Sequence, residues 1–335
     1  MTTYHAYAAQ SAGGLLEPFT YDVGDLAPEE VEVQVSHCGI CHSDLSMLDN
    51  EWGMSRFPLV LGHEVIGTVT ALGAQAKGLK VGQKVGVGWS ASSCLACHEC
   101  LSGHHQLCSS NQGTIVGRHG GFADRIRVQW AWARPLPEGL DPAKAGPLLC
   151  GGITVFSPFL VHGISSTARV GIIGIGGLGH MALQFARHWG CEVHAFTTSE
   201  SKEAEARQLG AHYVHNTKRD GALKGIAGRL NLIISTINVP QDIPGLLDTL
   251  APRGVLHVVG AVLKPLEVPA FGLITGQKSL AGSPTGSPTA IDLLLEFCAR
   301  HHIAPTTELF PMSKVNDALE HLRAGKARYR LVLQN

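Results

Sequence analysis

A glycine-rich segment near the middle of the chain constrains the fold more than any other feature. Gly174-Ile-Gly176-Gly177-Leu178-Gly179 follows the apolar run 168–174 and leads into a helical pattern over 178–189. A buried parallel strand, a tight glycine turn and a helix form the opening of a dinucleotide-binding unit, because the glycines let a pyrophosphate approach the helix N-terminus. The segment therefore predicts a dinucleotide site.

Strands and helices continue to alternate after this segment. The sequence predicts strands at 192–197, 212–215, 230–236 and 255–260, and helices at 203–209 and 243–250. Alternation at this spacing is typical of a doubly wound parallel sheet.

The two ends of the chain have a different pattern. The first 150 residues contain short segments of period-two alternation, at 31–35, 65–69 and 81–87, separated by glycine-rich turns. The tail contains amphipathic helices at 290–301 and 315–324 and a strand at 327–333. We therefore expect a split, mostly β domain formed by residues 1–152 and 288–335, with a nucleotide-binding domain of residues 153–287 inserted into it.

Charge and hydropathy exclude several classes of partner. Lys and Arg number 26 against 27 Asp and Glu, and no basic block stands out, so we expect no nucleic-acid binding. The N-terminus lacks the pattern of a secretory signal, and no run of about 18 apolar residues predicts a membrane span. A cytoplasmic protein with a small, near-neutral partner is expected.

Four of the nine cysteines form a compact cluster, C-x2-C-x2-C-x7-C, at Cys94, Cys97, Cys100 and Cys108. Four thiolates can close a tetrahedral shell around Zn²⁺ with no open position, which is a structural site. An iron–sulfur cluster also takes four thiolates, although its usual spacings differ, and four unrelated cysteines are the remaining alternative. Such a metal would fix a lobe that has little core of its own.

A second group of metal-ligand types is dispersed along the first domain. Cys41, His63 and Cys150 could supply the three protein ligands of a catalytic zinc, which keeps its fourth position open. A lone Cys or His is more often structural, but the three together, in this order around the cysteine cluster, indicate such a site. Glu64 adds a carboxylate next to the imidazole.

The end of the second predicted strand indicates which nicotinamide cofactor is used. NAD-binding proteins usually place Asp or Glu there to bind the ribose 2′-OH. Here Thr198 and Ser199 follow the strand, with Lys202 close behind, and hydroxyls with an ammonium would bind a 2′-phosphate. Glu200 lies nearby, and the following helix could point it outward. We expect NADP(H); the alternative is a polar strand end with a solvated lysine.

Together these segments resemble the zinc-dependent medium-chain dehydrogenases/reductases, and within them the cinnamyl alcohol dehydrogenases and their microbial aldehyde-reductase relatives. The resemblance covers nearly the whole chain through CGICHSD (38–44), GHE (62–64), the four-cysteine cluster, PLLCGGIT (147–154), GIGGLGH (174–180), FTTSESK (196–202) and ARYRLV (327–332). It implies an α/β protein in which a GroES-like irregular β catalytic domain joins a Rossmann doubly wound parallel sheet. It also implies two Zn²⁺ per chain, NADP(H) and a homodimer.

The resemblance assigns roles to individual residues. The catalytic zinc ligands fall on Cys41, His63 and Cys150, and Glu64 would lie close enough to the metal to replace water in a resting form. Thr154 would face the nicotinamide.

The resemblance also implies a proton relay, with one departure. Ser43 matches its first hydroxyl, Asp44 would orient His63, and His42 would contact the pyrophosphate or assist proton movement. The relay usually ends on a histidine, but Ser46 stands at that position, and serine does not titrate near neutral pH. Water could complete the relay, His42 could substitute, or proton transfer could be slower.

The substrate pocket is predicted to differ from that of a typical cinnamaldehyde site. Pro284 and Thr285 replace a pair that is often bulky and apolar, and the stretch 109–120 is short. Candidate lining residues are Trp52, Met54 and Trp89, each of which could equally belong to the core.

We expect hydride transfer between NADP(H) and a primary alcohol or aldehyde (aromatic, allylic or medium-chain), with zinc as a Lewis acid. The alternatives are a polyol dehydrogenase, a zinc-independent quinone or enoyl reductase, a zinc-containing reductase of an iminium or conjugated C=C bond, and an inactive zinc-stabilised binding protein. Three further cysteines have no assigned role and are expected to be buried thiols: Cys38, Cys191 and Cys298.

Overall fold

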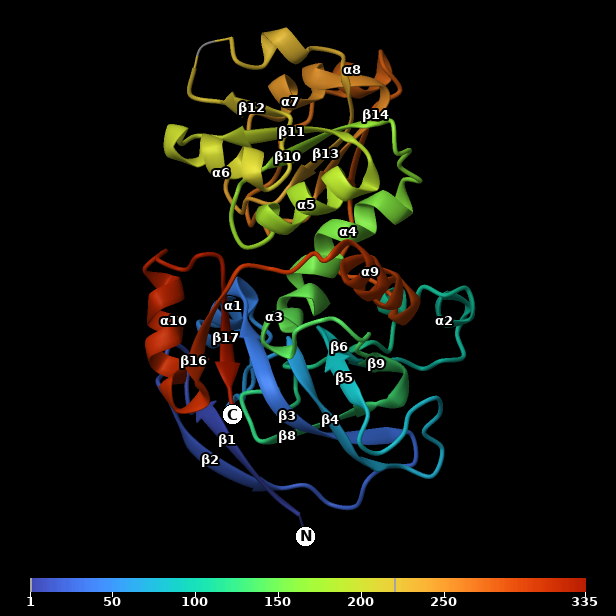
Figure 1. Ribbon diagram of the computed structural model, residues 1–335, viewed down its shortest axis with the longest axis vertical. Helices are drawn as coiled ribbons and strands as arrows, with labels where there is room; N and C mark the ends of the chain where they lie inside the picture. The colour runs from blue at the N-terminus through green and yellow to red at the C-terminus, as the bar shows by residue number, and fades with distance from the viewer. Residues whose placement is uncertain (1, 220) are drawn as a thin grey trace. The chain divides into compact units, whose positions relative to one another are not determined.

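The computed structural model describes residues 2–219 and 221–335 and divides the chain into two compact units (Figure 1). The first unit consists of Met1–Ile153 and Thr285–Asn335, and the second of Thr154–Pro284. Each unit has its own sheet.

The first unit is built on a mixed sheet in the order β16-β17-β3-β4-β5-β9, with β8 also paired to β3. Its strands are β1 Thr3–Ala9, β2 Leu16–Asp22, β3 Glu30–Ile40, β4 Val65–Leu72, β5 Lys84–Val87, β6 Ser90–Ser92, β7 Gln112–Gly113, β8 Arg125–Gln129, β9 Ala133–Pro135, β16 Thr307–Pro311 and β17 Arg330–Gln334. Its helices are α1 His42–Leu48, α2 His98–Leu101, α3 Pro142–Ala145, α9 Pro288–His301 and α10 Val315–Arg323. Helix α4, Gly151–Val161, begins in this unit and continues into the second.

One buried carboxylate ties β1, β4 and β8 of the first unit to β3. The Glu32 side chain accepts hydrogen bonds from Tyr4 (2.5 Å), Thr70 (3.0 Å), Arg125 (3.2 Å) and Arg127 (3.3 Å). These donors offset the cost of burying the charge and hold the pKa of Glu32 below its usual value against the opposing effect of burial. The network therefore fixes the start of the strand whose other end carries Cys41.

The second unit confirms the doubly wound parallel sheet. Its six strands run in the order β12-β11-β10-β13-β14-β15, and every pair is parallel. They are β10 Arg169–Ile173, β11 Glu192–Thr197, β12 Tyr213–Asn216, β13 Leu230–Ser235, β14 Leu250–Val258 and β15 Ser279–Gly282. Helices α5 Gly179–Trp189 and α6 Glu203–Gln208 contact β10–β12, whereas α7 Ile243–Thr249 contacts β14 and α8 Ala270–Ile274.

The predicted elements differ from the observed ones mainly at turns. The strand predicted from Val81 begins only at Lys84, because Gly82 turns the backbone with a positive φ of 85°. The strand predicted from Val255 already begins at Leu250 and pairs across an irregularity in its register with β13. The last strand begins at Arg330 rather than Ala327.

Within the described part of the chain, no single helix is long and apolar enough to cross a membrane. Two helices joined at a bend, Pro142–Leu149 and Gly151–Val161, together have the length and composition of a membrane span.

We expect a buried histidine to make the second unit sensitive to acid. His257 on β14 is fully buried, and its ring contacts the His162 imidazole (2.8 Å) and the Ser283 hydroxyl (2.9 Å). Burial and the neighbouring His162 lower the pKa of His257 to about 4, whereas an unfolded histidine titrates near 6.5. Between these values the unfolded state binds the proton and the folded state does not, so stability is full above pH 6.5 and falls as the pH drops toward 4.

We therefore expect the free energy of unfolding to fall by about 1–2 kcal/mol between pH 6.5 and 4.5 on account of His257. Denaturant unfolding of wild type and His257→Gln across this range measures the effect. The variant should be less stable at pH 7 but have a shallower pH dependence, and parallel curves would contradict the prediction.

Candidate metal and cofactor sites

Asp44, on the first turn of α1, links Cys41 to the segment that carries His63. Cys41 is the N-cap of α1, and its backbone N–H donates to Asp44 Oδ2 (2.8 Å). The other oxygen of Asp44 accepts hydrogen bonds from the Gly62 N–H (3.0 Å) and from His63 Nδ1 (3.1 Å). One buried carboxylate thus joins the Cys41 turn to the segment that carries His63. With Nδ1 engaged by Asp44, Nε2 is the ring nitrogen that faces Cys150 Sγ and is placed to bind a metal.

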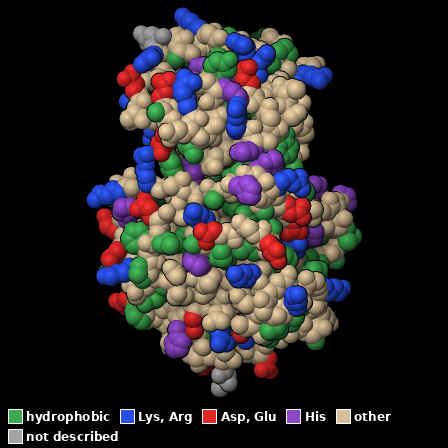
Figure 2. Space-filling view, viewed as in Figure 1, with side chains coloured by type: hydrophobic (Ala, Val, Ile, Leu, Met, Phe, Trp, Pro, Cys, Tyr) green, Lys and Arg blue, Asp and Glu red, His purple; other side chains and the backbone are tan. Residues whose placement is uncertain are grey.

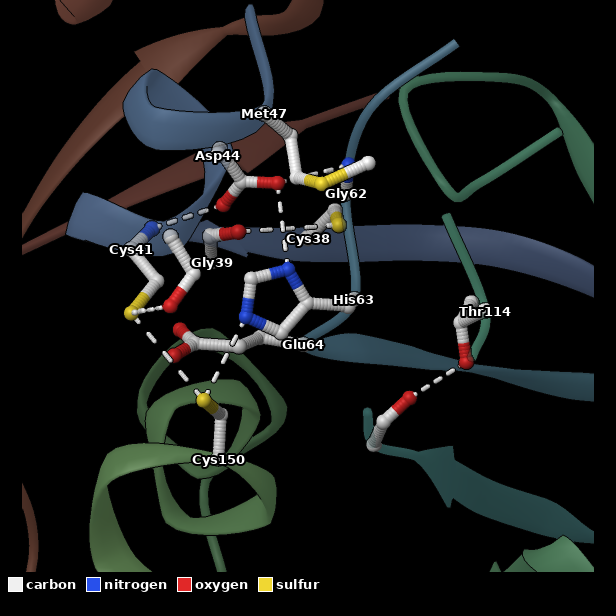
Figure 3. A network of polar contacts seen from close by, with 12 residues as sticks. Cys38, Gly39, Cys41, Asp44, Met47, Gly62, His63, Glu64, Thr114 and Cys150 are labelled. Atoms are coloured by element: carbon white, nitrogen blue, oxygen red, sulfur yellow. Dashed lines mark hydrogen bonds and ion pairs between the residues drawn. The ribbon is translucent and has the colours of Figure 1, made fainter. Parts of the chain in front are cut away.

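The structure brings together all four dispersed candidates. Atoms of Cys41, His63, Glu64 and Cys150 that could bind a metal lie within 4.8 Å of one another, and all four residues are buried (Figure 3). His63 Nε2 lies 3.3 Å from Cys150 Sγ, and the two sulfur atoms are 4.0 Å apart. Two thiols and an imidazole are a donor set that suits Zn²⁺.

Glu64 is held from its far side by an arginine that no sequence motif indicated. Arg330 on β17, only 4% exposed, forms an ion pair with Glu64 Oε1. The other oxygen, Oε2, is buried with no hydrogen-bond partner, and Figure 3 shows the carboxylate directed toward the two sulfur atoms. A Cβ at Gly39 would lie 2.1 Å from Oε2, so only glycine leaves room for this carboxylate. An orphaned buried oxygen beside two thiols fits a metal ligand.

The charges around this group favour a thiolate at Cys41. The hydrogen bond with Cys150 and the positive charges of Arg330 and His63 lower the pKa of Cys41 well below its usual value, against the effect of burial. Burial alone would lower the pKa of His63, but the charge and hydrogen bond of Asp44 outweigh it and raise this pKa. The thiolate is the form of cysteine that binds metal.

The candidate relay residues differ in their exposure and in their distance from the ligand group. Ser43 Oγ is 3.7 Å from Cys41 Sγ, whereas His42 is exposed on the first turn of α1 and lies outside the ligand group. Ser46 is buried, and its hydroxyl donates to Glu51 Oε2 (2.7 Å). The position where the resemblance implies a histidine is thus linked to an exposed carboxylate.

Two tryptophans stand beside the ligand group. The ring of Trp89 meets that of His63 edge to face at 5.1 Å, and Trp52 meets Trp89 at 6.0 Å. Both indoles are half-buried, and Met54 is 44% exposed. The tryptophans form an apolar wall next to the candidate metal ligand.

The cysteine cluster also converges. The sulfur atoms of Cys94, Cys97, Cys100 and Cys108 lie within 4.8 Å of one another, with Cys94 Sγ 3.5 Å from Cys108 Sγ. Backbone N–H groups of Ala96 and Cys97 lower the pKa of Cys94 to about 6, whereas burial raises that of Cys100 to about 12. No other described Cys, His, Asp or Glu contributes to this group, so it has the closed shell of four sulfurs that a structural zinc requires.

The glycine segment in the second unit forms the turn expected of a dinucleotide site. Gly174 has a φ of 87°, and a Cβ at Gly179 would lie 1.7 Å from the Gly174 carbonyl oxygen. A Cβ at Gly176 would meet nothing within 4 Å, so the surface above it is open. Gly177 and Leu178 complete the turn, with Leu178 as the N-cap of α5. A helix N-terminus with open space above a close-packed turn fits a pyrophosphate.

The residues after β11 lie against this turn. Lys202 Nζ donates to the Ile175 carbonyl oxygen (2.7 Å), which places the ammonium beside the glycine segment. The Ser199 N–H donates to Thr197 Oγ1 (3.1 Å), and Thr198 is exposed. Thr154 is buried on α4, four residues after Cys150 in the sequence.

Comparisons with known proteins agree with this arrangement. Residues 27–138 match the family "Alcohol dehydrogenase GroES-like domain", and residues 177–300 match the family "Zinc-binding dehydrogenase". The chain is 51% identical to the aldehyde reductase AdhA of Synechocystis sp. over 98% of each chain. A cinnamyl alcohol dehydrogenase structure from Sorghum bicolor has a TM-score of 0.94 at 36% identity, covering 99% of this chain and 98% of that one. One from Helicobacter pylori, complexed with NADP(H), has a TM-score of 0.90 at 29% identity, with 99% and 98% covered.

The chain therefore belongs to the zinc-dependent medium-chain dehydrogenases/reductases, of the cinnamyl alcohol dehydrogenase-like type. It is an oxidoreductase of alcohols and aldehydes. The expected fold class, a GroES-like domain with a Rossmann-type domain, is confirmed.

Proposed function

We propose that the chain transfers a hydride between NADP(H) and a primary alcohol or aldehyde, at a zinc ion held by Cys41, His63 and Cys150. The observation that carries this proposal is the buried group of two thiols, an imidazole and a carboxylate with one orphaned oxygen. When bound there, Zn²⁺ supplies Lewis-acid polarisation of the substrate oxygen.

The surrounding residues prepare this site for the reaction. Asp44 fixes the ring of His63, and Arg330 fixes Glu64 while leaving its second oxygen directed at the ligand group. Ser43 is our candidate for the hydroxyl that moves the proton to or from the substrate oxygen, because it lies beside Cys41. The Ser46 hydroxyl donates to the exposed Glu51 carboxylate, so a hydroxyl–carboxylate pair stands at the position where the resemblance implies a histidine.

The proposal of NADP(H) rests on the residues around the glycine turn. Lys202 and the hydroxyls of Thr198 and Ser199 present a cation and donors where a 2′-phosphate would bind. The nicotinamide supplies or accepts the hydride. The named ligand of the Helicobacter pylori relative is consistent with this choice.

An aromatic, allylic or medium-chain aldehyde is the proposed substrate class. The Trp89 ring beside His63, with Trp52 behind it, offers apolar surface for a hydrocarbon chain or ring next to the metal ligands. On the face drawn in Figure 2, basic and acidic side chains are interspersed, which suits a small neutral partner better than a nucleic acid.

We further propose two zinc ions per chain, a cytoplasmic location and a homodimer. The homodimer would pair through β15, which closes one end of the second unit's sheet, and through the exposed apolar side chains of Phe271 (77% exposed) and Ile274 (67%). Light scattering tests this, and a solution mass of 35.5 kDa would contradict the homodimer.

The function is tested by following cofactor oxidation with benzaldehyde, cinnamaldehyde and hexanal, using NADPH and NADH in parallel. We expect turnover that favours NADPH, disappears after chelation and returns with Zn²⁺.

Ser43→Ala should lower kcat about a hundredfold in this assay without changing NADPH binding, because only proton transfer is impaired.

Two results would contradict the proposal. Turnover that survives complete removal of zinc would exclude the assigned metal chemistry. No turnover with any aldehyde, despite bound zinc and cofactor, would exclude the assigned substrate class, and imines and conjugated alkenes would then be the substrates to test.

A further inference from the structure

Two loops at the carboxyl ends of β11 and β12 lie side by side in the second unit. The Thr217 N–H donates to the Thr197 carbonyl oxygen (2.9 Å), which extends the contact between the strands by one residue. Beyond it, Arg219 Nη2 donates to Glu200 Oε1 (2.6 Å). The loop after β12 therefore supplies a cation to the loop that carries the candidate phosphate-binding residues.

Glu200 is the one residue of that loop whose charge opposes NADP(H). It is the first residue after Ser199, and its loop is the place where a carboxylate usually binds the ribose 2′-OH of NAD. An unpaired carboxylate there would repel a 2′-phosphate, since like charges a few ångströms apart repel even near the protein surface. The sequence of this loop alone is thus ambiguous between the two cofactors.

The ion pair with Arg219 resolves the ambiguity. It directs the Glu200 carboxylate toward the loop after β12, whereas Lys202 reaches in the other direction to the Ile175 carbonyl of the glycine turn. Both side chains of the pair are about two-thirds exposed (70% and 68%), so the pair contributes little to folding stability. Its main physical effect is to reduce the negative charge near an anion bound at this loop.

Resting on the proposed use of NADP(H), we infer that Arg219 is a specificity-determining residue that acts through Glu200. The pair cancels the negative charge of Glu200 and holds it away, which leaves Ser199 and Lys202 to bind the 2′-phosphate. Without Arg219, the carboxylate is uncompensated and the preference for the phosphorylated cofactor falls by about tenfold, the size expected for one partly screened charge.

The inference is tested on nucleotide fragments, so that neither zinc nor hydride transfer enters the measurement. Calorimetry at fixed ionic strength gives the Kd of adenosine 2′,5′-bisphosphate and of adenosine 5′-monophosphate for the full chain. Wild type should prefer the bisphosphate, and Arg219→Ala should lower this preference about tenfold. Glu200→Gln combined with Arg219→Ala should restore it, because no carboxylate remains to be compensated.

A matched control is available on the next helix. Arg207 pairs with Glu203 at 3.0 Å, both side chains are 50% exposed, and Arg207→Ala removes the same charge from the same unit. It should change the preference by less than about twofold, because this pair lies within α6 rather than between the two loops.

The outcomes separate this inference from the proposed function. A wild type that binds both fragments equally would contradict the NADP(H) preference itself. If wild type prefers the bisphosphate but Arg219→Ala leaves the preference unchanged, the inference is wrong and the proposed cofactor stands. A loss that persists in the double variant would also overturn it, because Arg219 would then act on the phosphate without Glu200.

Discussion

Replacing Cys41 by alanine is expected to lower kcat/KM for aldehyde reduction by about a thousandfold or more, and to remove one of the two proposed zinc ions. The substitution removes a thiolate from a group that offers only three ligands besides Glu64. Polarisation of a carbonyl by a metal contributes several kcal/mol to the transition state, and each 1.4 kcal/mol is tenfold in rate. Zinc content by mass spectrometry and initial rates with NADPH measure the two effects.

Cys38 provides the matched control for this variant. It lies on β3 three residues before Cys41 and is fully buried, and its thiol donates to the Gly39 carbonyl and is not one of the four ligand-type residues of the group. Cys38→Ala should keep two zinc ions and nearly full activity, with a modest loss of stability from the small cavity. If Cys41→Ala retained its rate, or Cys38→Ala lost as much, the assignment of the reactive metal site would be wrong.

The parts of the site that the sequence predicted are those whose chemistry restricts the residue type. Cys41, His63 and Cys150 are of the residue types that Zn²⁺ favours, and the structure brings them together. Gly174 and Gly179 likewise stand where a positive φ and a close contact permit no side chain. Strict requirements of this kind leave a pattern that can be recognised without coordinates.

The parts that the sequence did not predict depend on pairs of residues far apart in the chain. Glu64 and Arg330 are separated by 266 positions, and only folding of β17 onto β3 brings them together. One signal was available, because Arg330 lies in the strand predicted at 327–333 and precedes the apolar residues Leu331, Val332 and Leu333, beside which a charge needs a partner. Its partner could not be identified from periodicity.

The Ser46 and Glu200 positions show the same limit at shorter range. The sequence identified Ser46 as a departure from the expected histidine, but not that its hydroxyl donates to Glu51 five residues later. It likewise left the direction of Glu200 open, which Arg219 on a neighbouring strand end determines. Side-chain direction at a loop depends on tertiary neighbours, which local patterns do not encode.

Loss of a ligand from the four-cysteine lobe is expected to lower the stability of the protein, whereas loss of Cys41 is expected to lower the reaction rate. Replacing Cys100 by serine should also remove one of two zinc ions, but its main effect should be on stability, with an apparent melting temperature lower by about 10 °C. The lobe has little core to replace the metal: α2 contains four residues, and Leu101 and Leu107 are 77% and 51% exposed. Apart from the thiolates, the segment is held by backbone hydrogen bonds within its short turns and by the contact of His105 with Trp132, so we expect loss of the four-sulfur shell to destabilise it.

Cys298→Ala is the control, since this thiol is fully buried on α9 outside both ligand groups. It should keep both zinc ions and lower the melting temperature less than Cys100→Ser does. Calorimetry, zinc content and the rate of the remaining folded protein at 20 °C then distinguish the two sites. A Cys100→Ser protein with two zinc ions and an unchanged transition would show that the lobe does not depend on metal. A protein that instead lost its rate while keeping its melting temperature would mean that the structural and catalytic assignments must be exchanged.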